Sequence, residues 1–306
     1  MKVFLVGEQF AAARTLETLL AIDDVRVVGV ACSEADGSRQ VATRADSLKI
    51  PVFPGERINQ PEHIEGIRRT APDLGLNVNS LLVFSDDLLS AFPAGAVNFH
   101  PGPLPEYAGL HVHQWAMING EQEHGVTFHR MTGTIDAGDV IMRAMFPIAP
   151  SDTGLKLFMR CIQRGVELIG PLIRGMRDGT IASRPQDLRR RVYYGRGPYD
   201  WEIDFTWPAA RIASLVRALD YQPFESPLGS PWISLEGRRY SVPEVRVVER
   251  AATAAAGALI GWTEQQDAIF ACGEGTAVVV PRLVADGRSL RAVDVLDARM
   301  GRPGLQ

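Results

Sequence analysis

Short apolar runs alternate with amphipathic segments through the first third of the chain. The apolar runs predict strands over residues 2–6, 25–31, 51–53, 74–78 and 96–99. Between them, a helical period of apolar positions predicts helices over 10–20, 39–48 and 61–70, with a short one over 86–91. Strands that alternate with helices indicate an α/β fold with a mainly parallel, doubly wound sheet.

The pattern continues to about residue 178. It predicts a helix over 112–118, strands over 126–130 and 140–146, and a long helix that begins after Ser151-Asp152-Thr153. The apolar stripe of that helix consists of Leu155, Phe158, Ile162, Leu168, Ile169 and Leu172. Pro171 is expected to kink this helix or to end its regular part.

A second domain is indicated by a change in periodicity. Residues 179–198 are polar, basic and contain glycine, as in a linker. A helix over 209–219 is followed by short alternating runs over 232–235, 239–248, 258–262, 268–272 and 276–280, with turn residues between them. We therefore predict a Rossmann-like catalytic domain over 1–184, a linker over 185–203 and a C-terminal β-rich domain over 204–306, built as a small OB-type barrel.

Composition restricts the function. The 306 residues carry a net charge of −4, which argues against a general nucleic-acid binder. The run Arg189-Arg190-Arg191 is expected to be a solvated part of the linker. The three cysteines, Cys32, Cys161 and Cys272, are far apart and indicate no disulfide framework, and Cys161 is expected in the core. No signal peptide or membrane-spanning run is recognised, so a cytoplasmic location is expected.

Two common cofactor motifs are absent. Gly7 after the first strand stands without the G-x-G-x-x-G pattern, and no Walker loop occurs. Five of the six histidines fall within residues 100–129, and His111 and His113 have a spacing that two metal ligands can adopt. No third ligand follows at a recognised spacing, so no metal is expected.

Asn98 and His100 are the most informative polar residues. They are two apart at the end of an apolar run, so on a strand their side chains share a face. The following Pro-Gly-Pro-Leu-Pro segment must turn, and this leaves an amide and an imidazole at a strand end, where α/β sheets bind ligands. An amide or protonated imidazole stabilises an oxyanion, and an imidazole carries protons. With Asp136 to orient and charge the imidazole, the group is suited to acyl transfer to an amine.

Three blocks in order then resemble one family. They are Asn98-Phe99-His100-Pro101-x-Pro103-Leu104-Pro105-x-Tyr107-x-Gly109, Trp115-Ala116-x-x-Asn119-Gly120-Glu121-x-Glu123-x-Gly125-Val126-Thr127, and Ile135-Asp136-Ala137-Gly138-Asp139-Val140-Ile141. This pattern resembles the folate-dependent formyltransferases, among them methionyl-tRNA, sugar and hydroxyornithine formyltransferases. The segment Asp204-Phe205-Thr206-Trp207-Pro208-Ala209 and the β-rich tail are similar to the C-terminal domain of the larger members.

The resemblance implies roles for individual residues. It places the catalytic groups on Asn98, His100 and Asp136, in preference to Asp139, and makes N10-formyltetrahydrofolate the formyl donor. The pterin pocket would consist of Ser80, Leu81, Leu82, Val83 and Phe84 on one side and of Thr132, Gly133 and Ile135 in the loop 131–135 on the other. Alternatively, residues 81–84 are ordinary residues of the hydrophobic core and line no pocket.

The acceptor side departs from the family pattern. Family members commonly have Ser-Leu-Leu-Pro after the histidine, where this chain has Gly102-Pro103-Leu104-Pro105. We therefore expect acceptor specificity to depend on this turn. The candidate acceptor-binding residues are Gly102, Tyr107, Gly109, His111 and Gln114, with His113 and Tyr194 as further candidates.

The expected acceptor is the amine or hydroxylamine of a small molecule, such as an aminosugar nucleotide or hydroxyornithine. Methionyl-tRNA formylation is an alternative, disfavoured by the short, non-basic segment 33–39 and by the acidic net charge. A formyl-folate hydrolase is a further alternative, disfavoured because the first strand begins at Lys2 and leaves no N-terminal regulatory domain. A folate-binding module without activity is disfavoured by the intact Asn98, His100 and Asp136. The sequence does not determine the oligomeric state.

Overall fold

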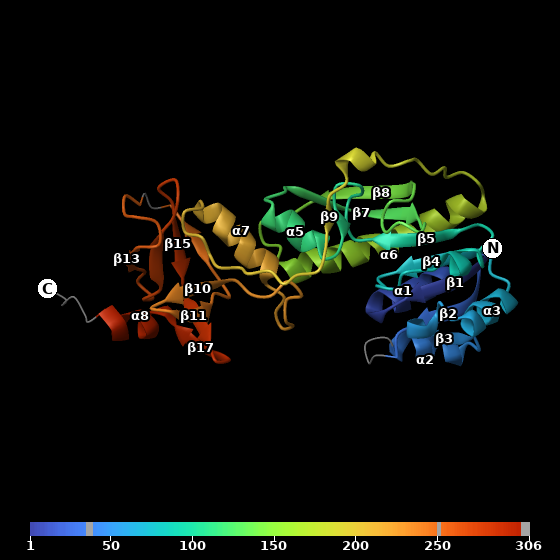
Figure 1. The fold of residues 1–306 in the computed structure, drawn as a ribbon, viewed down its shortest axis with the longest axis horizontal. Coiled ribbons are helices and arrows are strands. Elements are labelled where there is room, and N and C mark those ends of the chain that lie inside the picture. Colours follow the sequence, from blue (N-terminus) through green and yellow to red (C-terminus); the bar gives the residue numbers. More distant parts are fainter. Residues whose placement is uncertain (35–38, 250–251, 301–306) are drawn as a thin grey trace. The chain divides into compact units, whose positions relative to one another are not determined.

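The computed structural model describes residues 1–34, 39–249 and 252–300 (Figure 1). The chain divides into two compact units. The first consists of Met1–Val112, Glu123–Pro147 and Phe158–Gly195, and the second of His113–Gln122, Ile148–Leu157 and Arg196–Gln306. Within the described residues, no helix combines the length and the apolar character needed to cross a membrane.

A seven-stranded sheet forms the centre of the first unit. Its strands are β1 (Lys2–Gly7), β2 (Arg26–Cys32), β3 (Val52–Pro54), β4 (Leu74–Val78), β5 (Ala96–His100), β7 (Glu123–Arg130) and β8 (Val140–Pro147). The order is β3-β2-β1-β4-β5-β7-β8, and the first five strands are parallel. Strands β7 and β8 run antiparallel to their neighbours. The predicted α/β class with a mainly parallel sheet is confirmed.

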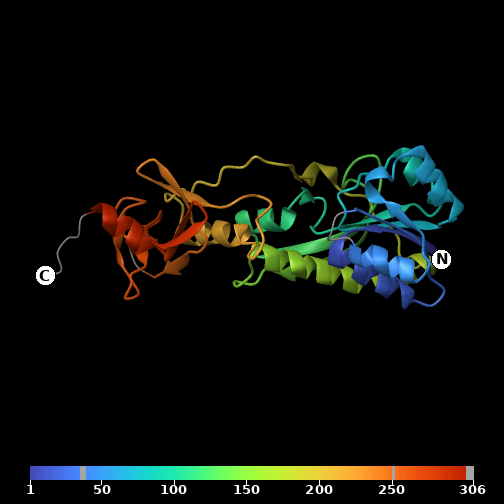
Figure 2. The same cartoon turned by 90° about the horizontal axis from the view of Figure 1, so that it is seen from below.

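Helices cover both faces of this sheet. They are α1 (Gln9–Leu20), α2 (Arg39–Ser47), α3 (Pro61–Arg69), α4 (Asp86–Leu89) and α6 (Gly154–Arg177), with a 3₁₀ turn at Gly55–Arg57. Figure 2 shows α1, α2 and α6 on one face and α3 on the other. Side chains alternate along β1 and therefore pack against the helices on both faces of the sheet. Val3 and Leu5 pack toward α1 and α6, whereas Phe4 and Val6 pack toward α3 and α4.

Of the two outcomes expected at Pro171, an end of the regular helix is wrong, whereas a kink stays a prediction. Helix α6 continues through Pro171 to Arg177. Pro171 lies on an exposed position, as does Glu167 one turn earlier, so the Glu167 carbonyl that loses its helical partner can be hydrated. The predicted core position of Cys161 is confirmed, since this residue is fully buried.

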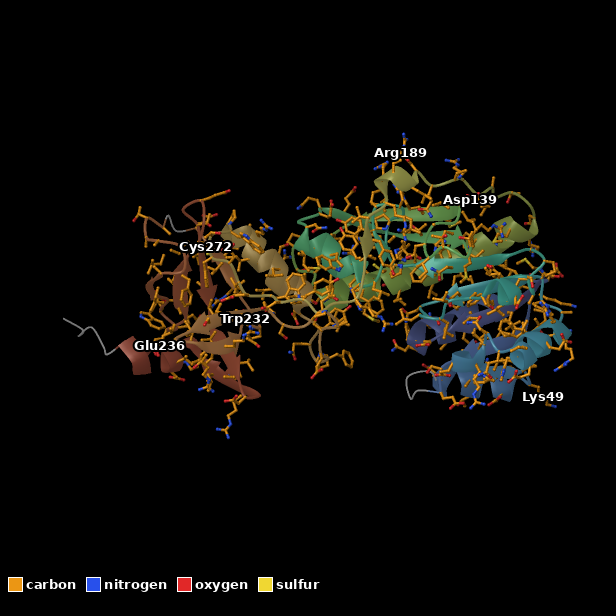
Figure 3. The ribbon with its side chains drawn as sticks, in the orientation of Figure 1. Lys49, Asp139, Arg189, Trp232, Glu236 and Cys272 are labelled. Atoms are coloured by element: carbon orange, nitrogen blue, oxygen red, sulfur yellow. The ribbon has the colours of Figure 1, made fainter. Side chains whose placement is uncertain are left out.

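Two short elements complete the first unit. Strand β6 (Ala108–Gly109) pairs with β9 (Tyr193–Tyr194) in parallel, and a 3₁₀ turn (Leu188–Arg190) precedes β9. The segment predicted as a linker, residues 185–203, therefore contains a strand, β9, that belongs to the first unit. The predicted solvation holds for Arg189, which points away from the ribbon in Figure 3 and whose side chain is 90% exposed.

The second unit contains two four-stranded antiparallel sheets. One has the order β10-β11-β16-β17 and the other β12-β15-β14-β13. The bounds are β10 (Trp232–Leu235), β11 (Arg238–Ser241), β12 (Arg246–Val248), β13 (Leu259–Trp262), β14 (Ala268–Ala271), β15 (Ala277–Val280), β16 (Arg282–Ala285) and β17 (Arg288–Arg291). Its helices are α7 (Ala209–Leu219) and α8 (Ala292–Met300), and α5 (Val112–Ile118) begins at the boundary of the units.

The predicted small β-rich C-terminal domain is confirmed as an antiparallel one, whereas its OB-type classification stays a prediction. The single strand predicted over 239–248 is wrong: it is divided into β11 and β12, with Pro243, which lacks an N–H donor, between them. The hairpin β16–β17 was not predicted, although its turn carries a strong signal. Asp286 and Gly287 both have positive φ, 50° and 72°, as an Asp-Gly hairpin turn requires.

Candidate active site

Asn98 and His100 lie on the same face of β5, the last strand of the parallel part of the sheet. The alternate residues Val97 and Phe99 pack into the core on the opposite face, where Phe99 lies against Phe128 with 5.4 Å between ring centroids. The strand ends at His100 because Pro101 cannot continue it. The two polar side chains are thereby held by a strand whose other face is anchored in the core.

Asp136 reaches this face from the loop between β7 and β8. Its carboxylate oxygen Oδ2 lies 3.6 Å from His100 Nδ1 and accepts the Gly109 N–H at 2.8 Å. Asp136 has a positive φ of 54°, an uncommon conformation for a residue with a side chain. The structure thus brings together Asn98, His100 and Asp136, the three residues that the sequence analysis selected. Asp139, labelled in Figure 3, instead accepts a hydrogen bond from Ser183 at 3.4 Å.

The loop that carries Asp136 is fixed by its backbone. Gln186 Nε2 donates to the carbonyls of Asp136 at 3.0 Å and of Gly138 at 2.6 Å. Gly138 is required at its position, because a Cβ there would stand 2.0 Å from the Arg130 carbonyl oxygen. The Ala-Gly that follows Asp136 in the sequence motif therefore has a steric reason. Gln186 was not singled out from the sequence, since it lies 50 residues from Asp136.

Burial and charge set the protonation of the site. Both side chains are almost completely buried, with His100 3% and Asp136 8% exposed. Burial lowers the pKa of His100, and the nearby Asp136 only partly opposes this. Burial raises the pKa of Asp136, but other groups, among them the His100 imidazole and the hydrogen bond from the Gly109 N–H, lower it more, so the carboxyl has a pKa below its ordinary value. At neutral pH the site holds a carboxylate beside an imidazole that is neutral.

Two further polar side chains were not predicted and lie against Asn98. Asn77 on β4 donates from Nδ2 to Asn98 Oδ1 at 2.9 Å. His129 on β7 lies with Nε2 3.1 Å from Asn98 Nδ2 and 3.4 Å from Asp136 Oδ1. The strand register was the missing information, since Asn77, Asn98 and His129 are direct partners across three strands.

The turn after His100 is held by side chains of β7. Thr127 Oγ1 donates to the Gly102 carbonyl at 2.7 Å and accepts the Leu104 N–H at 3.1 Å. His124 Nε2 donates to the Pro101 carbonyl at 2.9 Å. A Cβ at Gly102 would stand 2.8 Å from His100 Nε2, so a serine at this position requires that His100 or the turn shift. The Gly-Pro departure from the family pattern thus directly affects the imidazole.

His124 supplies a pH dependence of stability. Burial lowers its pKa from 6.5 to about 4. Below pH 6.5 the unfolded chain takes up a proton that the folded chain does not, so stability falls as the pH falls. We expect the wild type to lose about 2 kcal/mol from this group between pH 7 and pH 5. Urea unfolding of His124→Phe at both pH values should show a loss smaller by that amount.

The matched control for this prediction is Phe128→Leu, a core substitution on the same strand that introduces no titratable group. It should lower stability equally at pH 7 and pH 5. An unchanged pH dependence in His124→Phe would contradict the assignment of this loss to His124.

The predicted acceptor residues occupy distinct places. The Tyr107 carbonyl accepts from His100 Nε2 at 2.6 Å, and the Tyr107 ring stacks on Tyr194 with 5.4 Å between centroids. Gly109, at a φ of 96°, has no room for a Cβ against the Tyr194 carbonyl. His111 also has a positive φ, 54°.

Gln114 and His113 belong to the second unit, where both make contacts internal to that unit. Gln114 Nε2 donates to the Ala218 carbonyl at 2.9 Å and to Ser226 Oγ at 3.0 Å. His113 Nε2 is hydrogen-bonded to the Tyr221 hydroxyl. Among residues 1–34, 39–249 and 252–300, no group of three His, Cys, Asp or Glu side chains is placed to hold a metal ion.

The segment 80–84 that follows β4 presents apolar side chains to solvent. Leu81 and Val83 are 68% and 57% exposed, and Ile135 on the loop after β7 is 45% exposed. Leu82 is half-buried, its backbone N–H bonds to Ser80 Oγ at 3.1 Å, and Phe84 is buried in the core beside α4. Phe84 thus has the core role that was weighed as an alternative, whereas Leu81, Val83 and Ile135 are free to contact a ligand.

The second predicted pocket segment, loop 131–135, adjoins the first. Thr132 Oγ1 donates to the Thr134 carbonyl at 3.1 Å. A Cβ on Gly133 would lie 3.4 Å from Asp86 Oδ1, at the start of α4 directly after segment 80–84. The two segments therefore approach each other where Gly133 lies beside Asp86.

Comparison with known proteins defines the class. Residues 3–170 match the formyl transferase family, and residues 198–299 match the formyl transferase C-terminal domain. The chain therefore belongs to the formyl transferase family and is an enzyme of that class, as the sequence motifs predicted.

Solved structures share the fold. An N-formyltransferase from Helicobacter canadensis, in complex with folinic acid and dTDP-3-aminofucose, is 19% identical, with a TM-score of 0.66 over 92% of this chain and 98% of that one. The sugar 3N-formyl transferase WlaRD, with dTDP and 5-N-formyl-THF, is 18% identical, with a TM-score of 0.67 over 92% and 97%. HypX from Aquifex aeolicus, in complex with tetrahydrofolic acid, is 17% identical, with a TM-score of 0.58 over 98% of this chain and 48% of that chain.

Proposed function

We propose that this enzyme transfers the formyl group of N10-formyltetrahydrofolate to the primary amine of a small molecule, with an aminosugar nucleotide as the first candidate acceptor. The observation that carries the proposal is the cluster of the half-buried Asn98 with the buried His100 and Asp136 on β5 and the loop after β7, in a member of the formyl transferase family. Support for the acceptor comes from relatives that act on or bind aminosugars and are covered over 97% and 98% of their length. Hydroxyornithine is the second candidate.

In the proposed reaction, the amine nitrogen attacks the formyl carbon and the carbonyl oxygen becomes an oxyanion. An N–H of Asn98 and a protonated His100 stabilise this oxyanion. His100 starts neutral because burial lowers its pKa, so it can take a proton as the amine becomes bonded to carbon. Asp136, ionised throughout, stabilises the imidazolium. The proton then passes to N10 as the bond between the formyl carbon and N10 breaks.

The donor is proposed to lie with its pterin against Leu81, Val83 and Ile135. These side chains are exposed and apolar, and covering them removes apolar surface from water. The turn from Gly102 to Pro105 and the neighbouring Tyr107 and Gly109 are proposed to face the acceptor. The catalytic part of the chain is proposed to extend over residues 1–184.

The test is an assay with N10-formyltetrahydrofolate and a panel of amines, in which the appearance of tetrahydrofolate is followed by absorbance. A dTDP-linked aminosugar is expected to be formylated, with hydroxyornithine and aminoacylated initiator tRNA as the comparison acceptors. Release of formate without any acceptor would instead indicate a hydrolase. Calorimetric binding of folinic acid without turnover of any acceptor would indicate a binding module, and both outcomes would overturn the proposal.

A further inference from the structure

The amide of Asn98 is held between two side chains that have no part in the roles proposed so far. Asn77, Asn98 and His129 face one another across β4, β5 and β7, on the same face of the sheet. Both contacts of Asn98 are shielded from solvent, since Asn77 is 2% and His129 3% exposed. We infer that Asn77 and His129 are positioning residues that fix the orientation of the Asn98 amide. This inference rests on the proposed role of Asn98 in formyl transfer.

The direction of the hydrogen bonds follows from one backbone carbonyl. The Arg130 carbonyl oxygen lies 2.8 Å from His129 Nδ1 and can only accept, so Nδ1 carries the proton. Nε2 is then the ring nitrogen that remains to accept, and its nearer neighbour is Asn98 Nδ2 at 3.1 Å, against 3.4 Å for Asp136 Oδ1. The Asn98 oxygen must therefore face the other way, toward the Nδ2 donor of Asn77.

This arrangement leaves one donor of Asn98 for the substrate. A carboxamide has two N–H donors and one oxygen acceptor. Asn77 occupies the oxygen and His129 occupies one N–H, so the second N–H is the group that remains for an oxyanion. We call Asn77 and His129 the clamp. Without the clamp, the amide can rotate by 180° and present its oxygen, which would repel the oxyanion. The clamp thus selects the one amide orientation that can stabilise the transition state.

The position of His129 is itself specified locally. The β7–β8 register shifts between Phe128 and His129, but the extra residue, Ile141, lies on β8, and β7 pairs regularly with β5, so alternation alone places His129 on the face opposite Phe128. Phe128 remains in the core and His129 turns toward Asn98. Strand β7 therefore contributes Phe128 to the core and His129, the next residue, to the active site.

The experiment is a set of double-mutant cycles with Asn98. His129→Phe and Asn77→Leu keep a planar ring and a branched side chain, though somewhat larger ones, and remove the acceptor and the donor, so each should lower kcat about tenfold to a hundredfold. KM for the folate and the affinity for folinic acid should stay close to wild type. In an Asn98→Ala background the same changes should have little further effect, because the amide they orient is gone. His129→Gln, whose terminal oxygen reaches as far as Nε2 and accepts a hydrogen bond, should restore most of the lost kcat.

A spectroscopic readout keeps the clamp separate from the proposed function. In protein labelled with ¹⁵N-asparagine, the Asn98 side-chain amide is identified by its loss in Asn98→Ala. Its protons should exchange slowly with solvent in the wild type and in His129→Gln, and much faster in His129→Phe. If exchange is unchanged in His129→Phe, or if the kcat losses are equal in both backgrounds, the clamp is wrong. Slow exchange in a protein that formylates no amine would contradict the proposed function and leave the clamp standing.

Discussion

Replacement of His100 by alanine is expected to lower kcat for formyl transfer by about 10²- to 10⁴-fold, with a small change in KM for the folate. The imidazole is the side chain that carries the proton from the amine to N10 in the proposed mechanism. It lies 3.6 Å from the Asp136 carboxylate, and burial keeps it neutral until the oxyanion develops. The measurement is a single-turnover rate with saturating donor and acceptor.

His100 and Asp136 are expected to act as one unit, so that the kcat losses from replacing them are not independent. Asp136→Ala alone is expected to reduce kcat strongly, because its charge stabilises the imidazolium. In the His100→Ala protein it should add little, since the group that it stabilises is absent. His63→Ala, on α3, is the control and should keep wild-type kcat. Independent, multiplicative losses from His100 and Asp136 would contradict the proposed partnership.

The catalytic cluster was recognisable from the sequence because it depends on local rules. Asn98 and His100 share a face through strand alternation, and the Pro-Gly-Pro segment marks the strand end. Asp136 followed from the family pattern, and the structure adds the reason for its motif: Gly138 must approach the Arg130 carbonyl. Most helices and strands were likewise predictable from periodicity alone.

The partners of the cluster were not recognisable for the opposite reason. Asn77 and His129 are 21 and 31 residues from Asn98 and meet it only through the register of three strands. Alternation predicts the face of β7 on which His129 lies, but it does not reveal which residue of β5 lies opposite. Gln186 lies in a segment whose polar composition resembled a linker, yet its side chain holds the Asp136 loop. Tertiary hydrogen bonding decides the structure there, and the sequence pattern does not carry it.

Asn98 was predicted from the sequence, whereas its two partners, Asn77 and His129, were not. Asn98→Ala removes the remaining N–H donor to the oxyanion and is expected to lower kcat by about 10²- to 10³-fold. Asn98→Asp keeps the shape and can still accept from Asn77, but a carboxylate has no N–H and places negative charge beside the oxyanion. It should therefore be at least as inactive as the alanine variant.

The comparison of the two Asn98 variants distinguishes a role as hydrogen-bond donor from a role in filling space. If Asn98 acts only by filling space, the aspartate variant will retain most of the wild-type kcat, and the oxyanion role is then wrong. Folinic acid affinity, measured by calorimetry, should stay within a few-fold of wild type in both variants, because the donor pocket is proposed to lie on segment 80–84 and loop 131–135. A loss of kcat with retained binding places the effect of Asn98 in the transition state, where a group that stabilises an oxyanion must act.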